Sequence, residues 1–297
     1  MRTSTHRFYS DGLRIDGTFY LPDDRAEPRR QLPLLVVCSG FTGLCKIHPE
    51  RFARWFTRQG YACFGFDYRG FGNSEGVRFR VLLEEQVRDI RNAVTFASTS
   101  QYIDSENVFL AGWAMGGGLV LDAARELPEL TAIAAINGLF DGVSFQLSHR
   151  GPEGLVEFRE KIRAERLRRT LTGIAEYVDP FEIYPLDQVT RNYVTASLES
   201  VEGYDDTVCS FELAESLLRW SVLPAAAELR LPLFLAHGDR NELHLAEQAD
   251  DLEARYGGPV EALTLTGAGH TEWMHDGNPV FGQLCEQLHS WLKTVTN

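Results

Sequence analysis

Apolar and polar residues alternate through the first part of the chain, over residues 7–22. Two Asp-Gly pairs, at positions 11–12 and 16–17, interrupt this alternation. Alternation places every second side chain on one face of a strand, and Asp-Gly is a favoured pair in tight turns. The pattern therefore predicts an antiparallel β-hairpin at the start of the chain.

The pattern then changes to short continuous apolar runs that alternate with segments of helical periodicity. A continuous run is typical of a strand buried on both faces, and strands alternating with helices indicate a mostly parallel sheet covered by helices on both faces. The runs are residues 32–40, 61–68, 107–113, 130–138, 231–239 and 261–270, and the helical segments are residues 48–60, 83–97, 116–128, 242–258 and 281–292.

Residues 143–228 break this alternation and contain no clean buried strand. They hold a charged helical segment over residues 157–177 and an aromatic stretch with prolines over residues 179–193. About 85 residues are too many for a plain loop. We therefore predict a helical cap at 143–228, inserted into an α/β core formed by residues 1–142 and 229–297.

Composition narrows the classes of partner. The 297-residue chain carries 29 basic and 42 acidic residues, a net charge of −13, which argues against nucleic acid as a partner. The five cysteines have no metal-ligand spacing. We expect no bound metal, no cofactor, no membrane span and no signal peptide, and so a cytoplasmic protein with a small-molecule substrate. A homodimer is left open.

The segment NVFLAGWAMGGG, residues 107–118, carries the candidate chemistry. An apolar run ends in Gly112, and three glycines follow at 116–118. This spacing is typical of a buried strand that turns sharply into a helix and presents one side chain at the apex. Here the apex residue is Ala114, which has no nucleophilic atom.

Comparable segments follow the other predicted strands: SGFTG, DYRGFGNSEG, INGLFDG, HGDRNELH and GAGHTEW, in this order along the chain. In an open parallel sheet, ligands bind at the carboxyl ends of the strands. The ordered set resembles the α/β-hydrolase family, in particular its capped branch related to serine aminopeptidases, acyl-peptidases and dienelactone hydrolases. The resemblance covers nearly the whole chain outside the cap.

The resemblance implies roles for individual residues. Ala114 stands where the family's Gly-x-Ser-x-Gly motif has the nucleophilic serine, and His270 matches the general base. The backbone N–H groups of Met115 and Phe41 match the two donors of the oxyanion hole. The position of the triad's acid is Asn241, with Asp239, Glu242 and Asp141 as alternatives that spacing does not separate.

Loss of the serine hydroxyl removes the covalent route, because a methyl group forms no acyl-enzyme. Candidate substrate-binding residues are Ser39, Thr42, Trp113, Tyr184 and Trp273, with core packing as the competing interpretation for the aromatic residues of the cap. Three other histidines have structural interpretations: His237 as a buried strand-end residue, and His48 and His244 as capping or surface residues.

Three interpretations of Ala114 are open. We favour an enzyme that uses His270 and the oxyanion hole for non-covalent lyase, isomerase or cyclase chemistry on a medium-sized hydrophobic carbonyl compound, such as an ester, a thioester or a polyketide-like metabolite. The second is a serine hydrolase inactivated by a Ser→Ala change. The third is a ligand-binding protein that kept the pocket and lost the chemistry.

Overall fold

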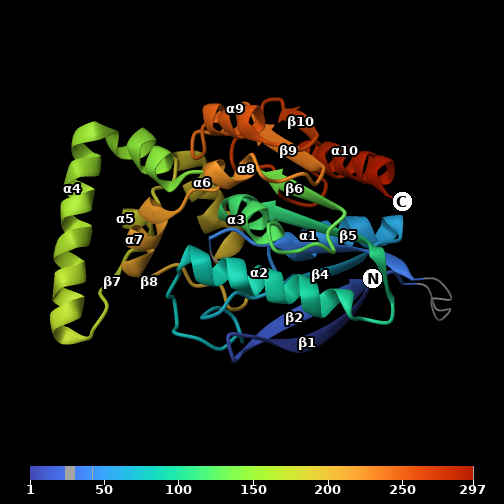
Figure 1. Ribbon diagram of the computed structural model, residues 1–297, viewed down its shortest axis with the longest axis horizontal. Coiled ribbons are helices and arrows are strands. Elements are labelled where there is room, and N and C mark those ends of the chain that lie inside the picture. The colour runs from blue at the N-terminus through green and yellow to red at the C-terminus, as the bar shows by residue number, and fades with distance from the viewer. Residues whose placement is uncertain (24–30, 42, 297) are drawn as a thin grey trace.

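The computed structural model describes residues 1–23, 31–41 and 43–296. Within these ranges an eight-stranded sheet runs through the molecule in the order β1-β2-β4-β3-β5-β6-β9-β10 (Figure 1). β2 is antiparallel to its neighbours β1 and β4, and every other pairing is parallel. The strands are β1 (Arg2–Ser10), β2 (Leu13–Leu21), β3 (Leu32–Cys38), β4 (Ala62–Phe66), β5 (Ile103–Trp113), β6 (Ala132–Ile136), β9 (Leu233–Gly238) and β10 (Val260–Leu265).

Helices cover the sheet on both faces, with α2 and α3 in front of the strands in Figure 1 and α1 behind them. The fold class predicted from the sequence, an α/β-hydrolase fold with a mostly parallel sheet, is confirmed. The helices of this layer are α1 (His48–Phe56), the short 3-10 helix η1 (Thr57–Gln59), α2 (Leu83–Ser98), α3 (Met115–Ala124), α9 (Ala246–Arg255) and α10 (Pro279–Val295).

The N-terminal hairpin is confirmed, but only one of its two Asp-Gly pairs is a turn. Asp11 and Gly12 both have positive φ, 50° and 81°, and connect β1 to β2. Gly17 instead lies inside β2, opposite Phe66 of β4. A Cβ at Gly17 would lie 2.4 Å from the ring of Phe64, so this glycine allows close packing of an aromatic side chain.

The chain between β6 and β9 is mainly helical. Its first element, α4 (Gly142–Thr172), bends at Gly151 and Pro152 and extends along one side of the molecule (Figure 1). The helix ends at Gly173, whose φ of 72° ends it earlier than the predicted segment 157–177. The division into core and cap stays a prediction. The remaining elements are β7 (Tyr177–Val178), α5 (Pro180–Ile183), α6 (Gln188–Tyr193), the π-helical turn η2 (Val194–Leu198), β8 (Cys209–Ser210), α7 (Glu212–Arg219) and α8 (Leu223–Ala226).

Candidate active site

Ala114 occupies a strained turn between β5 and α3. Its φ and ψ are 53° and −121°, a conformation that is costly for a residue with a Cβ, of the order of 1–3 kcal/mol. The backbone N–H of Ala114 donates a hydrogen bond to the carbonyl of Ile136 at the end of β6, 3.0 Å away. The sharp elbow expected from the glycine spacing is therefore present, with a methyl group at its apex.

The glycines around the elbow are required by close backbone contacts. A Cβ at Gly112 would lie 2.2 Å from the carbonyl oxygen of Gly116, and one at Gly116 would lie 2.2 Å from the carbonyl oxygen of Ser39. Neither backbone oxygen can move away without disrupting the elbow. The motif thus holds β5, α3 and the loop after β3 against each other.

The two predicted oxyanion donors are the backbone N–H groups of Met115, at the start of α3, and of Phe41, in the loop after β3. Met115 is the first residue of α3, so its N–H has no acceptor within the helix. A Cβ at Gly40 would lie 3.2 Å from the Cβ of Ala114, which brings the loop before Phe41 against the elbow. No acceptor is found for either N–H among the described residues. Their role in binding an oxyanion stays a prediction.

His270, in the loop after β10, forms a hydrogen bond with Asn241, whose side-chain oxygen is 3.2 Å from Nδ1. The same oxygen accepts bonds from the backbone N–H groups of Leu243, at 3.1 Å, and His244, at 3.0 Å. These N–H donors fix the orientation of the amide, because only its oxygen can accept from them. Nδ1 of His270 therefore carries the proton, and Nε2 has a free lone pair.

The surroundings keep His270 uncharged. Burial lowers the pKa of its imidazole well below the usual range, and the neighbouring His244, His237 and His48 lower this pKa further. Asn241 is neutral, so it does not compensate a charge on the ring as a carboxylate does. The ring is a neutral acceptor across the physiological pH range.

Neither aspartate alternative contacts His270. Asp141 is the N-cap of α4, where its carboxylate accepts from the backbone N–H of Ser144 at 2.6 Å. Asp239 accepts from the backbone N–H of Gly267 at 2.7 Å and is exposed at a turn. Both carboxylates thus stabilise local backbone structure, and the side chain of Glu242 is exposed. Of the four candidates it is Asn241 that lies against the imidazole.

His244 is not a capping or surface residue, as its position in the sequence had suggested. It is fully buried, and its ring centroid is 4.8 Å from that of His270. Nδ1 donates to the carbonyl of Asn137, 2.7 Å away, so Nε2 accepts from the hydroxyl of Tyr184 at 2.5 Å. Burial, the largest cause, lowers the pKa of His244 to about 3. This second neutral imidazole links the core to residue 184 of the predicted cap.

Asn137, at the end of β6, organises the same corner and was missed in the sequence. It is fully buried with a φ of 47°. Its side-chain amide donates to the carbonyls of Gly269 and His270, at 3.2 and 2.8 Å, and its side-chain oxygen accepts from the N–H of Gly238. The signal was available, because an Asn-Gly pair ends the apolar run 130–138 and Asn tolerates positive φ.

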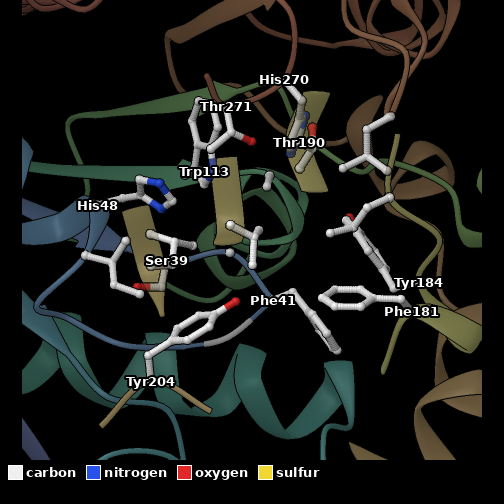
Figure 2. Close-up of a pocket in the computed structure, with 17 residues that line it drawn as sticks. Ser39, Phe41, His48, Trp113, Phe181, Tyr184, Thr190, Tyr204, His270 and Thr271 are labelled. Carbon is white, nitrogen blue, oxygen red and sulfur yellow. The ribbon is translucent and has the colours of Figure 1, made fainter. Parts of the chain in front are cut away.

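A cavity of about 70 Å³ lies above the elbow (Figure 2). Its walls come from the loop after β3, the elbow, the loops after β9 and β10, and the segment 181–204. Ligand pockets commonly measure about 300–1,000 Å³, so a medium-sized ligand requires side chains of that segment to move. Most of the lining side chains are apolar or aromatic.

The predicted substrate-binding residues separate into three groups. Ser39, Trp113 and Tyr184 line the cavity together with Ala114 and His270. Trp273 is not among the lining residues: its ring packs edge-on against Trp113, 5.4 Å between centroids, and its Nε1 donates to the carbonyl of Gly269. Thr42 lies outside the described residues.

Two further histidines behave differently from each other. His237 is a buried strand-end residue as predicted, with Nε2 2.8 Å from the carbonyl oxygen of His244. His48 was expected at the surface or as a cap, but it is buried and lines the cavity beside Trp113 (Figure 2). Its sequence position at a helix start gave no sign of this, because the cavity wall is formed by segments far apart in the chain.

Other classes of site were also sought among the described residues. Across residues 1–23, 31–41 and 43–296, no three or more His, Cys, Asp or Glu side chains are grouped so that they could hold a metal ion. In the same ranges no helix has the length and apolarity needed to cross a bilayer. The expectations about cofactors, a homodimer, nucleic acid and cellular location stay predictions.

The serine aminopeptidase S33 family model matches residues 29–276. This chain belongs to that family. The match begins before β3 and ends beyond His270, so it includes the elbow, Asn241 and the whole segment between β6 and β9.

Individual proteins resemble the chain over most of its length. An uncharacterized 31.7 kDa Escherichia coli protein from the traX-finO intergenic region is 25% identical over 255 residues, 85% of each chain. The polyketide transferase grgF of Penicillium sp. is 24% identical over 273 residues, covering 89% of this chain and 87% of its own. The crystal structure of the α/β-hydrolase GrgF from Penicillium sp. sh18 superposes with a TM-score of 0.82 at 21% identity, covering 100% of this chain and 99% of that one.

Proposed function

We propose that this protein is an enzyme that acts on a hydrophobic carbonyl compound without forming an acyl-enzyme. His270 acts as the general base, and the backbone N–H groups of Phe41 and Met115 bind the oxygen that becomes negative. The reaction class is a lyase, isomerase or cyclase reaction that begins with removal of a proton next to the carbonyl. The observation that carries the proposal is the free lone pair of His270 Nε2 in a cavity whose elbow holds a methyl group.

The elbow itself excludes one route. A covalent intermediate requires an attacking oxygen, sulfur or nitrogen at position 114, and Ala114 has none. The methyl group leaves the space in front of His270 to the substrate. A carbon acid bound there can present its C–H bond to Nε2, while its carbonyl oxygen accepts from the two backbone N–H groups.

Protonation of His270 is more favourable when the proton comes from the substrate than when it comes from solvent. A protonated His270 lacks a carboxylate partner, because Asn241 is neutral. When the proton comes from the substrate, the enolate oxygen gains the negative charge as the ring gains the positive one. The new ion pair is then compensated within the cavity, where the low dielectric strengthens the attraction.

The proposed substrate class rests on the side chains that line the cavity and on the names of similar proteins. Aromatic side chains such as Phe41, Phe181 and Trp113 surround the cavity, which favours an acyl or ring substituent of apolar character. One relative is named a polyketide transferase, and polyketide intermediates carry carbonyl groups with acidic neighbouring C–H bonds. We therefore propose esters, thioesters and polyketide-like ketones as the compounds to test.

Exchange of substrate protons with solvent tests the proposal directly. A panel of such compounds in D₂O should incorporate deuterium next to the carbonyl in the presence of the protein. We expect the His270→Ala variant to lose this activity by about 10²–10⁴-fold. Exchange that persists in His270→Ala, with the same positions labelled, would contradict the role of this base.

An inactivated serine hydrolase is the second candidate, and the backbone of Ala114 favours it. The strained φ of 53° is kept although glycine would relieve it. If this candidate holds, Ala114→Ser gains hydrolysis of short aryl esters and thioesters, and the gain disappears in the Ala114→Ser, His270→Ala double variant. Under our proposal Ala114→Ser gains no hydrolysis beyond background and loses deuterium exchange.

The third interpretation is a binder without chemistry. In that case a co-purified ligand is detected by native mass spectrometry, and the compound is recovered unchanged and without deuterium after incubation in D₂O. His270→Ala then changes affinity but no turnover. Our proposal predicts labelled or converted compound in the same experiment.

A further inference from the structure

His48 places an unused polar group in the wall of the cavity. It is the first residue of α1, and its side chain is only 6% exposed. Its Nε2 is buried and has no hydrogen-bond partner among the described residues. An unpaired buried polar atom costs of the order of 1–3 kcal/mol, so its presence in a wall that ligand contacts requires an explanation.

Trp113 separates His48 from the proposed base. The centroid of its ring is 5.2 Å from that of His48 and 5.4 Å from that of His270. Figure 2 shows the His48 imidazole pointing into the cavity from the side away from Tyr184 and Phe181. The cavity thus has two imidazoles, one next to the elbow and one beyond the indole.

Five other lining residues carry a hydroxyl group. That of Thr271, next to His270, has no hydrogen-bond partner among the described residues, and the other four are already engaged by the protein. Each donates to an acceptor of its own: Ser39 to the carbonyl of Leu44 at 2.7 Å, Tyr184 to His244 at 2.5 Å, Thr190 to Asp187 at 2.5 Å and Tyr204 to Asp206 at 3.0 Å. In contrast to these hydroxyls, His48 has its hydrogen-bonding capacity available for a ligand. It is therefore suited to select a polar group on an otherwise apolar molecule.

We propose that His48 is a specificity residue that hydrogen-bonds a second oxygen function of the ligand, a hydroxyl group remote from the carbonyl at the elbow. A hydroxyl both donates and accepts, so it matches either tautomer of a neutral imidazole. This inference deepens the proposed function by adding to the substrate class, and it rests on that proposal only for the position of the carbonyl. The binding role itself does not require turnover.

Matched ligand pairs test the inference without catalysis. Straight-chain methyl ketones of six to nine carbons, each with and without a terminal hydroxyl group, are titrated by calorimetry into the His270→Ala protein. We expect one chain length at which the hydroxylated ketone binds about ten-fold more tightly than its partner, since a site built for a hydroxyl group rejects the analogue that lacks it.

Substitution of His48 then assigns the preference. His48→Phe in the same background should reduce the ten-fold preference to within two-fold, and His48→Gln should retain part of it because the amide still hydrogen-bonds. The control is His237→Gln, at a buried histidine whose Nδ1 is also without a partner among the described residues but which does not line the cavity. This control should leave the preference unchanged.

Several results overturn the inference. A hydroxyl preference that survives His48→Phe, or no preference or no binding across the series, shows that His48 does not select a ligand oxygen, whether or not an ordered water satisfies it instead. Thermal unfolding checks the variant: His48→Phe should melt at the same temperature or higher, because it removes an unpaired polar group. Because every binding measurement uses the His270→Ala protein, failure of the proposed catalysis does not affect the outcome.

Discussion

Two buried polar clusters of this protein differ in how completely their hydrogen-bonding groups are paired. In the first, Arg69 lies after β4 and pairs with Asp89 of α2, which is completely buried. The guanidinium donates to both carboxylate oxygens of Asp89, at 2.6–3.0 Å, and also to Ser10 and Asp11. This cluster ties the N-terminal hairpin to the core, and its charges compensate each other.

The second cluster consists of His48, His237, His244, His270 and Asn241, in and behind the wall of the cavity, and part of its hydrogen-bonding capacity is unused. Nε2 of His48, Nδ1 of His237 and Nδ2 of Asn241 lack partners among the described residues. In the part of the chain that the structure describes, no carboxylate forms a hydrogen bond with the ring of His270, whose side-chain partner is Asn241. We therefore expect stability and function to be separated: the ion-paired cluster joins the N-terminal hairpin to the core, and the neutral cluster leaves His48, in the cavity wall, free to bind a ligand.

The largest expected effect is on catalysis at the neutral cluster. His270→Ala should reduce turnover in the deuterium-exchange assay by about 10²–10⁴-fold, because it removes the proposed base. The loss in the free energy of unfolding should be smaller than the increase in activation free energy that this factor represents, because the uncharged ring takes part in no ion pair. Loss of activity that merely follows unfolding, seen in denaturant titrations of the same sample, would argue against a catalytic role.

A substitution in the ion-paired cluster should have the opposite profile. Arg69→Met leaves the buried carboxylate of Asp89 without a charged partner, with only the backbone N–H of residue 69 still donating to it at 3.1 Å. We expect the free energy of unfolding to fall by about 3–5 kcal/mol. Urea titration followed by circular dichroism measures this change. Arg88→Met is the control, because Arg88 and Asp11 form an exposed pair whose loss should cost less than about 1 kcal/mol. Equal losses for the two variants would contradict the comparison.

Asn241→Asp gives His270 a negatively charged partner, as Asp89 is for Arg69 in the first cluster. A carboxylate 3.2 Å from Nδ1 stabilises the imidazolium, so it raises the pKa of His270 by about one to three units. The base is active only when neutral. In the wild type its pKa lies well below the usual range, so activity persists as pH falls below 6.5. In the variant the acid limb of kcat/KM against pH should move to higher pH by the same one to three units. An unchanged limb would show that His270 does not set it.

The smallest expected effect concerns the strain at the elbow. Ala114→Gly relieves a φ of 53° but adds chain entropy to the unfolded state, so we expect a net stabilisation of about 0.5–1 kcal/mol. Ala164→Gly, in the exposed middle of α4, has no strain to relieve and should lose about 1 kcal/mol. Thermal unfolding of both variants gives the comparison. Destabilisation by both would mean that the elbow stores no strain at residue 114.

The sequence was sufficient to predict the elements and the elbow, because both depend on local patterns. Continuous apolar runs give buried strands, and the spacing of Gly112 and Gly116 around Ala114 is visible within five residues of sequence. The contact that requires Gly112 is equally local, with the carbonyl oxygen of Gly116, whereas the contact that requires Gly116 is with Ser39 on the loop after β3. The same locality explains one error. The Asp-Gly pair at residues 16–17 has a turn signature, but the ring of Phe64, on another strand, determines its conformation.

The chemistry between elements was not predictable in this way. The helix expected from residue 242 begins only at Ala246, because the side-chain oxygen of Asn241 accepts from the N–H groups of Leu243 and His244 and holds a loop there. That loop turns His244 beneath His270. His48 reaches the cavity from α1, on a different part of the sheet. Contacts between residues of different elements depend on tertiary packing, and the spacing of residues in a single sequence does not reveal them.

The protonation state of His270 in solution tests the central claim most directly. ¹⁵N NMR of the imidazole nitrogens, assigned by comparison with His270→Ala, reports which nitrogen carries the proton. We predict a neutral ring with the proton on Nδ1 and a bare Nε2, unchanged from pH 7.5 down to pH 5.5. A charged ring at pH 7, or a proton on Nε2, would contradict the account, because His270 would then present no free lone pair to the substrate.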